Sequence, residues 1–462
     1  MLIGALMMPH PPIAVHEIGR GEESAIQPTL DSFEACAKLV KQLAPDTIIV
    51  TTPHAVMYRE WFNVSDGDTA YGDFSRYRAR SVSFAQPYDR DFTRKLTRLC
   101  EKEGFPAGTQ YDRDPELDQG TMVPLYFINK EYQDYKLVRI GLSGLSLPEH
   151  YRFGTLIQKL CMEDDRKYLI LASGDLSHCQ KADGPYGLHP EGPVYDERIM
   201  HTMGSAAFAE LMEYDASFLE KAEECGHRSF TIMAGILDGL AVKPTVLTHE
   251  ATLGVGYGFV CYEILGSDPG RRFLEQYETN LISSIKHKYE NGDAYVRLAR
   301  ASVESWVTKH KILKVPETID PALVREKAGA FVSIHEHGML RGCIGTIAAM
   351  RKNLAEEIIQ NAVSACSRDP RFEPIQASEL PFLEISVDVL GEAERIKDAS
   401  ELDVKRYGVI CSTPDGRRGL LLPDLDGVDT VEEQIRIACS KGRIDPFDEE
   451  LILERFEVIR HA

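Results

Sequence analysis

Three short apolar runs in the first half of the chain are each cut off by proline or glycine and followed by a histidine. The runs are residues 2–8, 46–52 and 167–173, and the histidines after them are His10, His54 and His178. Short runs rich in Ile, Val and Leu are typical of strands that are buried on both faces. The pattern predicts an α/β fold for the N-terminal half, with a central sheet flanked by helices.

The position of these histidines predicts a metal site. In open α/β sheets, ligands bind beyond the carboxyl ends of the strands, so histidines at such ends meet although they lie far apart in the sequence. Imidazole is a common metal ligand and a good acid or base near neutral pH. His10 and His54 each stand beside a proline that fixes the backbone. We therefore expect a metal site with a catalytic histidine beside it.

Acidic and sulfur-bearing residues near these histidines are further candidates. Asp175 stands three residues before His178 and could orient its ring or accept its ring proton. A third metal ligand could be Glu224, a hard oxygen donor suited to Fe(II), or Cys225, a soft thiolate. Glu250, just before the last strand expected in this half, is another option for the third ligand.

Composition narrows the class of protein. The net charge of −20 argues against nucleic acid or an anionic membrane as a partner, because both require a basic surface. The ten cysteines include no CxxC pair, which favours reduced thiols in the cytoplasm over disulfides. No run approaches the ~20 apolar residues of a membrane helix, and residues 2–8 lack the basic leader of a signal peptide. We expect a cytoplasmic protein.

A cluster of breaker residues predicts two domains. Residues 266–272 (GSDPGRR) would separate an N-terminal domain of residues 1–268 from a C-terminal domain of residues 276–462. The second half is expected to open with an amphipathic helix over residues 294–309. Strands that are segregated from helices favour an α+β fold there.

The motifs of the first half resemble those of a known family. PHPP, TTPHA, LDQGTMVPLYF, SGDLSH and ECGHRSF, in this order, are similar to the class III extradiol ring-cleavage dioxygenases (LigB type) and their Memo relatives. The resemblance covers residues 1 to about 265. It implies that His10 and His54 bind the metal and that His178 is the acid/base residue.

The resemblance leaves the third ligand open. Cys225-Gly226 resembles the Memo pattern, in which a cysteine takes the third metal position, whereas the dioxygenases usually place there a carboxylate, which Glu224 would supply. Fe(II) is the expected ion, with Zn and Cu as alternatives. The chain also departs from the dioxygenases, which often carry Asp-His-Gly where it has Asp118-Gln119-Gly120. Gln119 is kept as a catalytic candidate, although an amide cannot shuttle a proton.

The second half resembles the AMMECR domain. Its hallmark LRGCIG spans residues 340–345, and the likeness extends over about residues 280–460. The two resemblances together match the AmmeMemoRadiSam system protein A family, which implies radical-SAM proteins of that system as partners. We expect Cys343 to be a small buried packer, with a reactive thiol beside Arg341 as the alternative.

The expected function is that of a metal-dependent, dioxygenase-like protein acting on a catechol-like or other small aromatic molecule. Two histidines and a carboxylate would leave positions open on Fe(II) for substrate and dioxygen. The alternatives are a non-catalytic metal-binding or adaptor protein of the Memo type and a metal-dependent enzyme of different chemistry. A homo-oligomer is one of the expected options for the quaternary structure.

Overall fold

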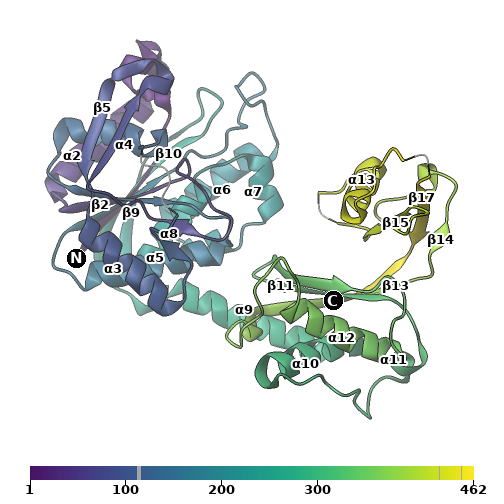
Figure 1. Ribbon diagram of the computed structural model, residues 1–462. Coiled ribbons are helices and arrows are strands. Elements are labelled where there is room, and N and C mark those ends of the chain that lie inside the picture. The colour runs from purple at the N-terminus through teal and green to yellow at the C-terminus, as the bar shows by residue number, and fades with distance from the viewer. Residues whose placement is uncertain (112–115, 426, 449) are drawn as a thin grey trace. The chain divides into compact units, whose positions relative to one another are not determined.

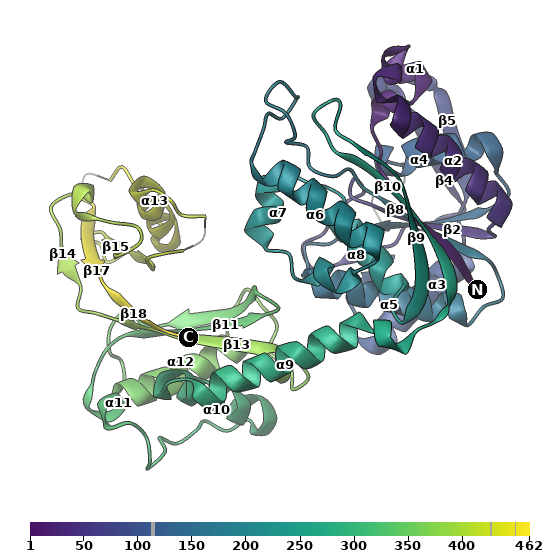
Figure 2. The ribbon, with the colours of Figure 1, turned by 180° about the vertical axis from the view of Figure 1, so that it is seen from behind.

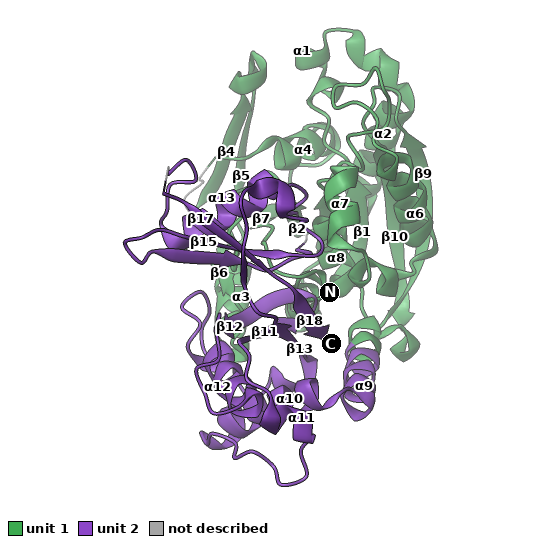
Figure 3. Ribbon diagram, turned by 90° about the vertical axis from the view of Figure 1, so that its right-hand side faces the viewer, with its two compact units in different colours: residues 1–277 green, residues 278–462 purple. Residues whose placement is uncertain are grey.

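The structure is a computed structural model of the 462-residue chain, and it describes residues 1–111, 116–425, 427–448 and 450–462. The chain divides into two compact units, Met1–Tyr277 and Glu278–Ala462 (Figure 3). The division falls inside helix α9 (Phe273–Asn291), whereas the breaker cluster at 266–272 ends a strand and forms a short 3-10 turn. Each unit has apolar clusters of its own.

A six-stranded sheet with the order β7-β2-β8-β1-β10-β9 forms the centre of the first unit. Its strands are β1 (Leu2–Met8), β2 (Thr47–Thr52), β7 (Lys136–Gly141), β8 (Tyr168–Ser173), β9 (Leu240–Glu250) and β10 (Tyr257–Ser267). The four strands from β7 to β1 are parallel, while β10 and β9 are each antiparallel to the preceding strand of the sheet. The predicted central sheet is confirmed, and its strands β2, β8 and β1 are adjacent.

Helices cover both faces of this sheet (Figures 1 and 2). One apolar cluster joins α2 and α4 to one face, and a second joins α3, α5, α6 and α8 to the other. The helices are α1 (His16–Gly19), α2 (Gln27–Leu43), α3 (Arg90–Glu103), α4 (Gln119–Glu131), α5 (Leu147–Met162), α6 (Glu191–Ser205), α7 (Ala216–Ala222) and α8 (His227–Ile236). Because strands β1, β2, β7 and β8 are buried on both faces, they carry almost uninterrupted apolar sequences.

Shorter strands lie outside the central sheet. Strands β4 (Thr69–Phe74) and β5 (Ala79–Pro87) form an antiparallel hairpin, and β3 (Phe62–Asn63) pairs with β6 (Ala107–Gly108). Strand β9 was not anticipated from the sequence, since its residues are mostly half-buried or exposed and show no continuous apolar run.

The second unit is α+β, as predicted. Two four-stranded sheets have the orders β12-β11-β13-β18 and β14-β17-β15-β16. The helices α10 and α12 pack on the first sheet, and α13 packs on the second. The elements are α10 (Ala294–Lys309), α11 (Pro321–Arg325), β11 (Ala330–Glu336), β12 (Met339–Gly345), α12 (Leu354–Ser367), β13 (Leu383–Leu390), β14 (Glu394–Arg395), β15 (Gly408–Ser412), β16 (Arg418–Leu421), α13 (Val431–Gly442), β17 (Ile452–Phe456) and β18 (Val458–His461).

Within the described part of the chain, every helix is too short or too polar to cross a lipid bilayer.

Candidate metal centre

Three neighbouring parallel strands deliver the predicted histidines to one edge of the sheet. His10 follows β1, His54 follows β2 and His178 follows β8, and β8 lies between the other two strands. The backbone order of the sheet therefore brings together three residues that span most of the first unit's sequence.

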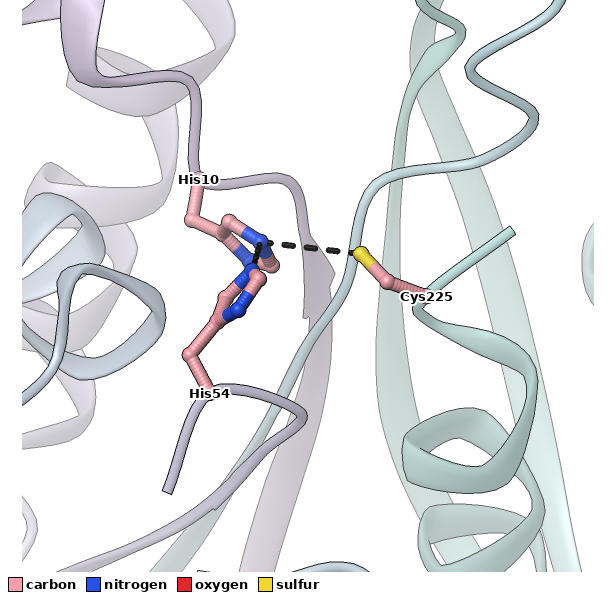
Figure 4. Close-up of side chains that lie close together, drawn as sticks. All are labelled: His10, His54 and Cys225. Atoms are coloured by element: carbon pink, nitrogen blue, oxygen red, sulfur yellow. Dashed lines mark hydrogen bonds between the residues drawn. The ribbon is translucent and has the colours of Figure 1, made fainter. Parts of the chain in front are cut away.

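His10, His54 and Cys225 point toward a common centre (Figure 4). The Nε2 atoms of the two histidines are 2.9 Å apart, and the Cys225 Sγ lies 3.6 Å from the His10 Nε2. The two imidazole rings are nearly perpendicular, at 83°, with centroids 4.7 Å apart. Two nitrogens and one sulfur thus face one another from three separate segments of the chain.

The hydrogen bond made by His10 Nδ1 fixes the ring so that the lone pair of its Nε2 faces His54 and Cys225. The Ser173 hydroxyl donates to the Gly120 carbonyl at 2.6 Å, so its oxygen must accept the hydrogen of His10 Nδ1, 2.9 Å away. A neutral ring protonated on Nδ1 carries its lone pair on Nε2. Metal-binding histidines are commonly held in this way by a hydrogen bond to their other nitrogen.

The donor set fits a divalent transition metal. Metal–nitrogen bonds of ~2.0–2.1 Å place adjacent ligand nitrogens about 3 Å apart, close to the separation of the two Nε2 atoms. Burial lowers the pKa of His10 to about 3 and that of His54 to about 4, so both rings are neutral at pH 7. Burial also raises the pKa of the Cys225 thiol well above its usual value. A cation would reverse this effect by stabilising the thiolate.

The structure places the carboxylate candidates for the third ligand elsewhere. The Glu224 carboxylate accepts a hydrogen bond of 2.6 Å from the backbone N–H of His227, at the start of α8. Glu250 accepts hydrogen bonds from the backbone N–H and hydroxyl of Thr29, in the first turn of α2, and from Thr252. Among the described residues, neither belongs to a group of three or more converging ligand atoms.

Close backbone packing brings Cys225 to the histidines. The loop after β8 and the loop before α8 touch at Gly174 and Gly226, where a Cβ on Gly174 would lie 2.1 Å from the Gly226 Cα. The Cys225 Sγ accepts a hydrogen bond of 3.3 Å from the backbone N–H of Asp175. Only glycine at these two positions permits this approach. Residues 224–227 (ECGH) and 173–175 (SGD) therefore belong to one site.

His178 and Asp175 lie beside this cluster. A ring nitrogen of His178, a carboxylate oxygen of Asp175 and the Cys225 Sγ all lie within 4.8 Å of one another. The His178 ring stacks on Tyr186, with centroids 5.1 Å apart. Asp175 also accepts a hydrogen bond of 2.7 Å from the backbone N–H of His10, and burial raises its pKa to about 6.

Gln119 is the first residue of α4, and the residue beside it, Asp118, has the more extensive contacts. The Asp118 carboxylate caps α4, accepts from the Thr52 hydroxyl at 2.5 Å, and pairs with the fully buried Arg139 at 2.9 Å. Burial alone would raise the Asp118 pKa, but Arg139 and these hydrogen bonds lower it. Sequence reasoning missed this pair, although an arginine inside the apolar run KLVRIGL was a signal of it.

In the second unit, the LRGCIG segment forms β12. Cys343 is half-buried, and its Sγ accepts a hydrogen bond of 3.2 Å from the Ser333 hydroxyl. Arg341 pairs with Glu379 at 2.7 Å. The backbone N–H of Cys343 donates to Asp369 at 2.9 Å, which links the strand to residues 369–374 (DPRFEP).

Comparisons with known proteins agree with the division of the chain into two units. The family described as the catalytic LigB subunit of aromatic ring-opening dioxygenase matches residues 4–260, and the AMMECR1 family matches residues 296–461. A protein of Clostridium acetobutylicum is 40% identical over 468 residues, which cover 100% of this chain and 99% of that protein.

Other relatives match about a third of the chain. A protein of Thermotoga maritima is 46% identical over 168 residues, or 36% of this chain and 96% of its own length. The crystal structure of an uncharacterized protein from Pyrococcus horikoshii is 31% identical, with a TM-score of 0.35, and covers 37% of this chain and 89% of that one. The chain therefore belongs to the family of the catalytic LigB subunit of aromatic ring-opening dioxygenase, and in it this domain is fused to an AMMECR1 domain.

Proposed function

We propose that the first unit holds one Fe(II) ion and acts as an extradiol-type dioxygenase on a catechol-like or other small aromatic substrate. The convergence of His10, His54 and Cys225, with a further histidine, His178, beside them, carries this proposal. A bound Fe(II) ion would supply the redox chemistry that dioxygen requires and a positive charge that favours a deprotonated phenol.

His178 would serve first as a base and then as an acid. Burial lowers its pKa, so the ring is neutral at pH 7 and can accept a phenolic proton. The neighbouring Asp175 carboxylate would stabilise the protonated ring, and stacking on Tyr186 fixes the ring plane. His178 would later return the proton to the product. Both oxygen atoms of dioxygen would enter the product as one ring C–C bond breaks, so no further reductant is needed.

The same site supports a second candidate function, a non-catalytic metal-binding protein of the Memo type. Two observations favour it: the third donor nearest the histidines is a thiol, and Gln119 stands where a proton-carrying histidine is common in the dioxygenases. A zinc-dependent enzyme of different chemistry, such as a hydrolase, would use the same donors.

Anaerobic loading with Fe(II), followed by oxygen-uptake measurements on a panel of catechols, separates these functions. The dioxygenase proposal expects about one iron per chain at this site and stoichiometric oxygen uptake with at least one catechol. His178→Ala should keep the iron and lower turnover by roughly 10²–10⁴-fold, as for a lost general acid/base. His201→Ala, an exposed histidine of α6, is the matched control and should leave turnover unchanged.

Two results would contradict the proposal. An iron-loaded protein that consumes no oxygen with any catechol favours the non-catalytic alternative. A His178→Ala variant that turns over substrate at the normal rate removes His178 from the mechanism.

A further inference from the structure

A second group of possible metal ligands lies outside the site described above. A ring nitrogen of His189, the Sγ of Cys179 and a carboxylate oxygen of Glu223 all lie within 4.8 Å of one another. Cys179 and His189 belong to the long segment between β8 and α6, whereas Glu223 ends α7. None of the three takes part in the group around His10, so the two sets of donors can be tested separately.

A hydrogen bond to the backbone sets the tautomer of His189. Its Nδ1 lies 3.0 Å from the backbone carbonyl of Lys221, and a carbonyl can only accept a hydrogen bond. The neutral ring therefore carries its proton on Nδ1 and its lone pair on Nε2. A backbone carbonyl that holds the second ring nitrogen is the usual partner of a metal-binding histidine. The same turn of the chain supplies the carbonyl of Lys221 and the side chain of Glu223.

Cys179 and Glu223 complete a mixed donor set. The Cys179 side chain is fully buried, and its thiol donates a hydrogen bond of 3.9 Å to the Tyr186 carbonyl. Glu223 is held at a positive φ of 48° as the residue that ends α7, with its backbone N–H bonded to the Glu220 carbonyl. On metal binding, the thiol would release its proton to solvent, leaving one thiolate and one carboxylate to balance a divalent cation.

We propose that Cys179, His189 and Glu223 bind a zinc ion that fixes the segment carrying His178. One sulfur, one nitrogen and one oxygen donor suit Zn²⁺, which is four-coordinate and takes all three ligand types, with water in the remaining position. This segment also contains Tyr186, on which the His178 ring stacks, and the backbone N–H of His178 donates to the Glu223 carbonyl at 3.3 Å. The ion would therefore hold the backbone of His178 in place, whatever reaction the first site performs.

Co²⁺ serves as a spectroscopic substitute for zinc in the test. The full-length Cys225→Ser variant removes the thiol of the first site, so any thiolate-to-cobalt charge-transfer band must come from another cysteine. We expect this band in Cys225→Ser and its loss in Cys225→Ser/Cys179→Ser. A band that is absent from the single variant, or that persists in the double variant, would overturn the proposal.

Substitutions of the other two ligands give an independent test in the same Cys225→Ser protein. His189→Gln and Glu223→Gln should each weaken Co²⁺ binding at this site by at least ~10-fold, as expected for a lost ligand. The exposed residues His201 and Glu220, changed to Gln, are the matched controls and should leave the band and the affinity unchanged. If the double cysteine variant does not fold, as judged by circular dichroism, full affinity in His189→Gln overturns the proposal by itself.

The positioning role has its own measurement. In the His10→Ala/His54→Ala variant, which lacks the first site's histidines, Zn²⁺ should slow amide hydrogen exchange over residues 178–190 relative to a chelator-treated sample. Adding His189→Gln to this variant should abolish the effect. Zinc binding without slower exchange in this segment would show that the ion does not fix it.

Discussion

At the scale of single residues, the hydroxyl of Ser173 determines which nitrogen of His10 can bind a metal. It donates to the Gly120 carbonyl and so accepts the hydrogen of His10 Nδ1. Nothing in the sequence SGD indicates this role, because it depends on α4 beginning next to the end of β8. The same holds for Cys225 and Glu224: adjacent in sequence, one faces the histidines and the other caps a helix.

Ser173→Ala should therefore weaken metal binding without unfolding the protein. Loss of the bond that orients a metal-binding histidine costs roughly 10–100-fold in metal affinity. Competition with a chelator of known affinity measures the change. Ser32→Ala is the matched control, since Ser32 is a buried serine that donates to the Pro28 carbonyl within α2. Equal metal affinity in both variants would contradict the role assigned to Ser173.

In the second unit, the side chain of Asp369 holds the backbone of strand β12 at Cys343. Its buried carboxylate accepts from the backbone N–H of Cys343 and pairs with Arg371 at 2.7 Å. The hydrogen bond from Arg371 lowers the pKa of Asp369 to about 2. Because the pKa is lower in the folded state, the carboxylate stabilises the fold above the unfolded pKa of ~3.9, and this contribution is lost as the pH falls through the folded value.

Asp369→Asn should lower the free energy of unfolding of the second unit at pH 7 by about 1.5–3 kcal/mol, the range for a hydrogen bond to a charged group. The difference from wild type should shrink between about pH 4 and pH 2. The chain has two tryptophans, so the Trp61→Phe background leaves Trp306 of α10 to report urea unfolding of this unit.

The matched control for this experiment is Asp415→Asn. Asp415 makes the same Asp-x-Arg pair with Arg417, but on the exposed surface, where such pairs contribute little. A difference between wild type and Asp369→Asn that does not change with pH would contradict the assignment to the ionised carboxylate.

At the scale of elements, the loop before α8 and the loop after β8 pack directly against each other. They touch at Gly174 and Gly226, and this contact holds Cys225 next to Asp175. The apolar runs of the buried strands could be predicted from the sequence. The contact between two glycines, 52 residues apart along the chain, could not, because each glycine alone is compatible with any turn.

Gly174→Ala should therefore reduce metal affinity, although Gly174 is not itself a ligand. The added methyl would lie 2.1 Å from the Gly226 Cα and 3.0 Å from the Phe230 Cζ, so the two loops must separate. We expect a loss of about 1–3 kcal/mol in stability, as for overpacking, together with a measurable loss of metal affinity. Gly204→Ala in α6 is the control, because its methyl would meet only the end of the Val246 side chain. Unchanged metal binding in Gly174→Ala would show that the loops adjust independently.

At the scale of the whole molecule, the chain consists of two units with separate cores, and the groups of candidate metal ligands among the described residues all lie in the first. Metal binding should therefore stabilise the first unit alone. A ligand that binds only the folded state at 100 times its Kd adds about 2.7 kcal/mol. Trp61 and Trp306 lie in different units, so the Trp306→Phe variant reports the first unit and Trp61→Phe reports the second.

We expect chelation to lower the urea midpoint of the Trp61 signal and to leave that of the Trp306 signal unchanged. His54→Ala should remove the part of the shift that is due to the first site. An equal shift of both signals would mean that the two units unfold together.

The sequence by itself determined the class of fold, the two-part organisation and the candidate residues at the strand ends. It could do so because buried parallel strands need continuous apolar runs, and because such strands present their carboxyl ends at one edge. Only the tertiary structure decided that Cys225 faces the histidines, that Glu224 and Glu250 cap helices, and that Asp118 pairs with Arg139. These outcomes depend on which loops touch, and on contacts between residues far apart along the chain, which local patterns do not encode.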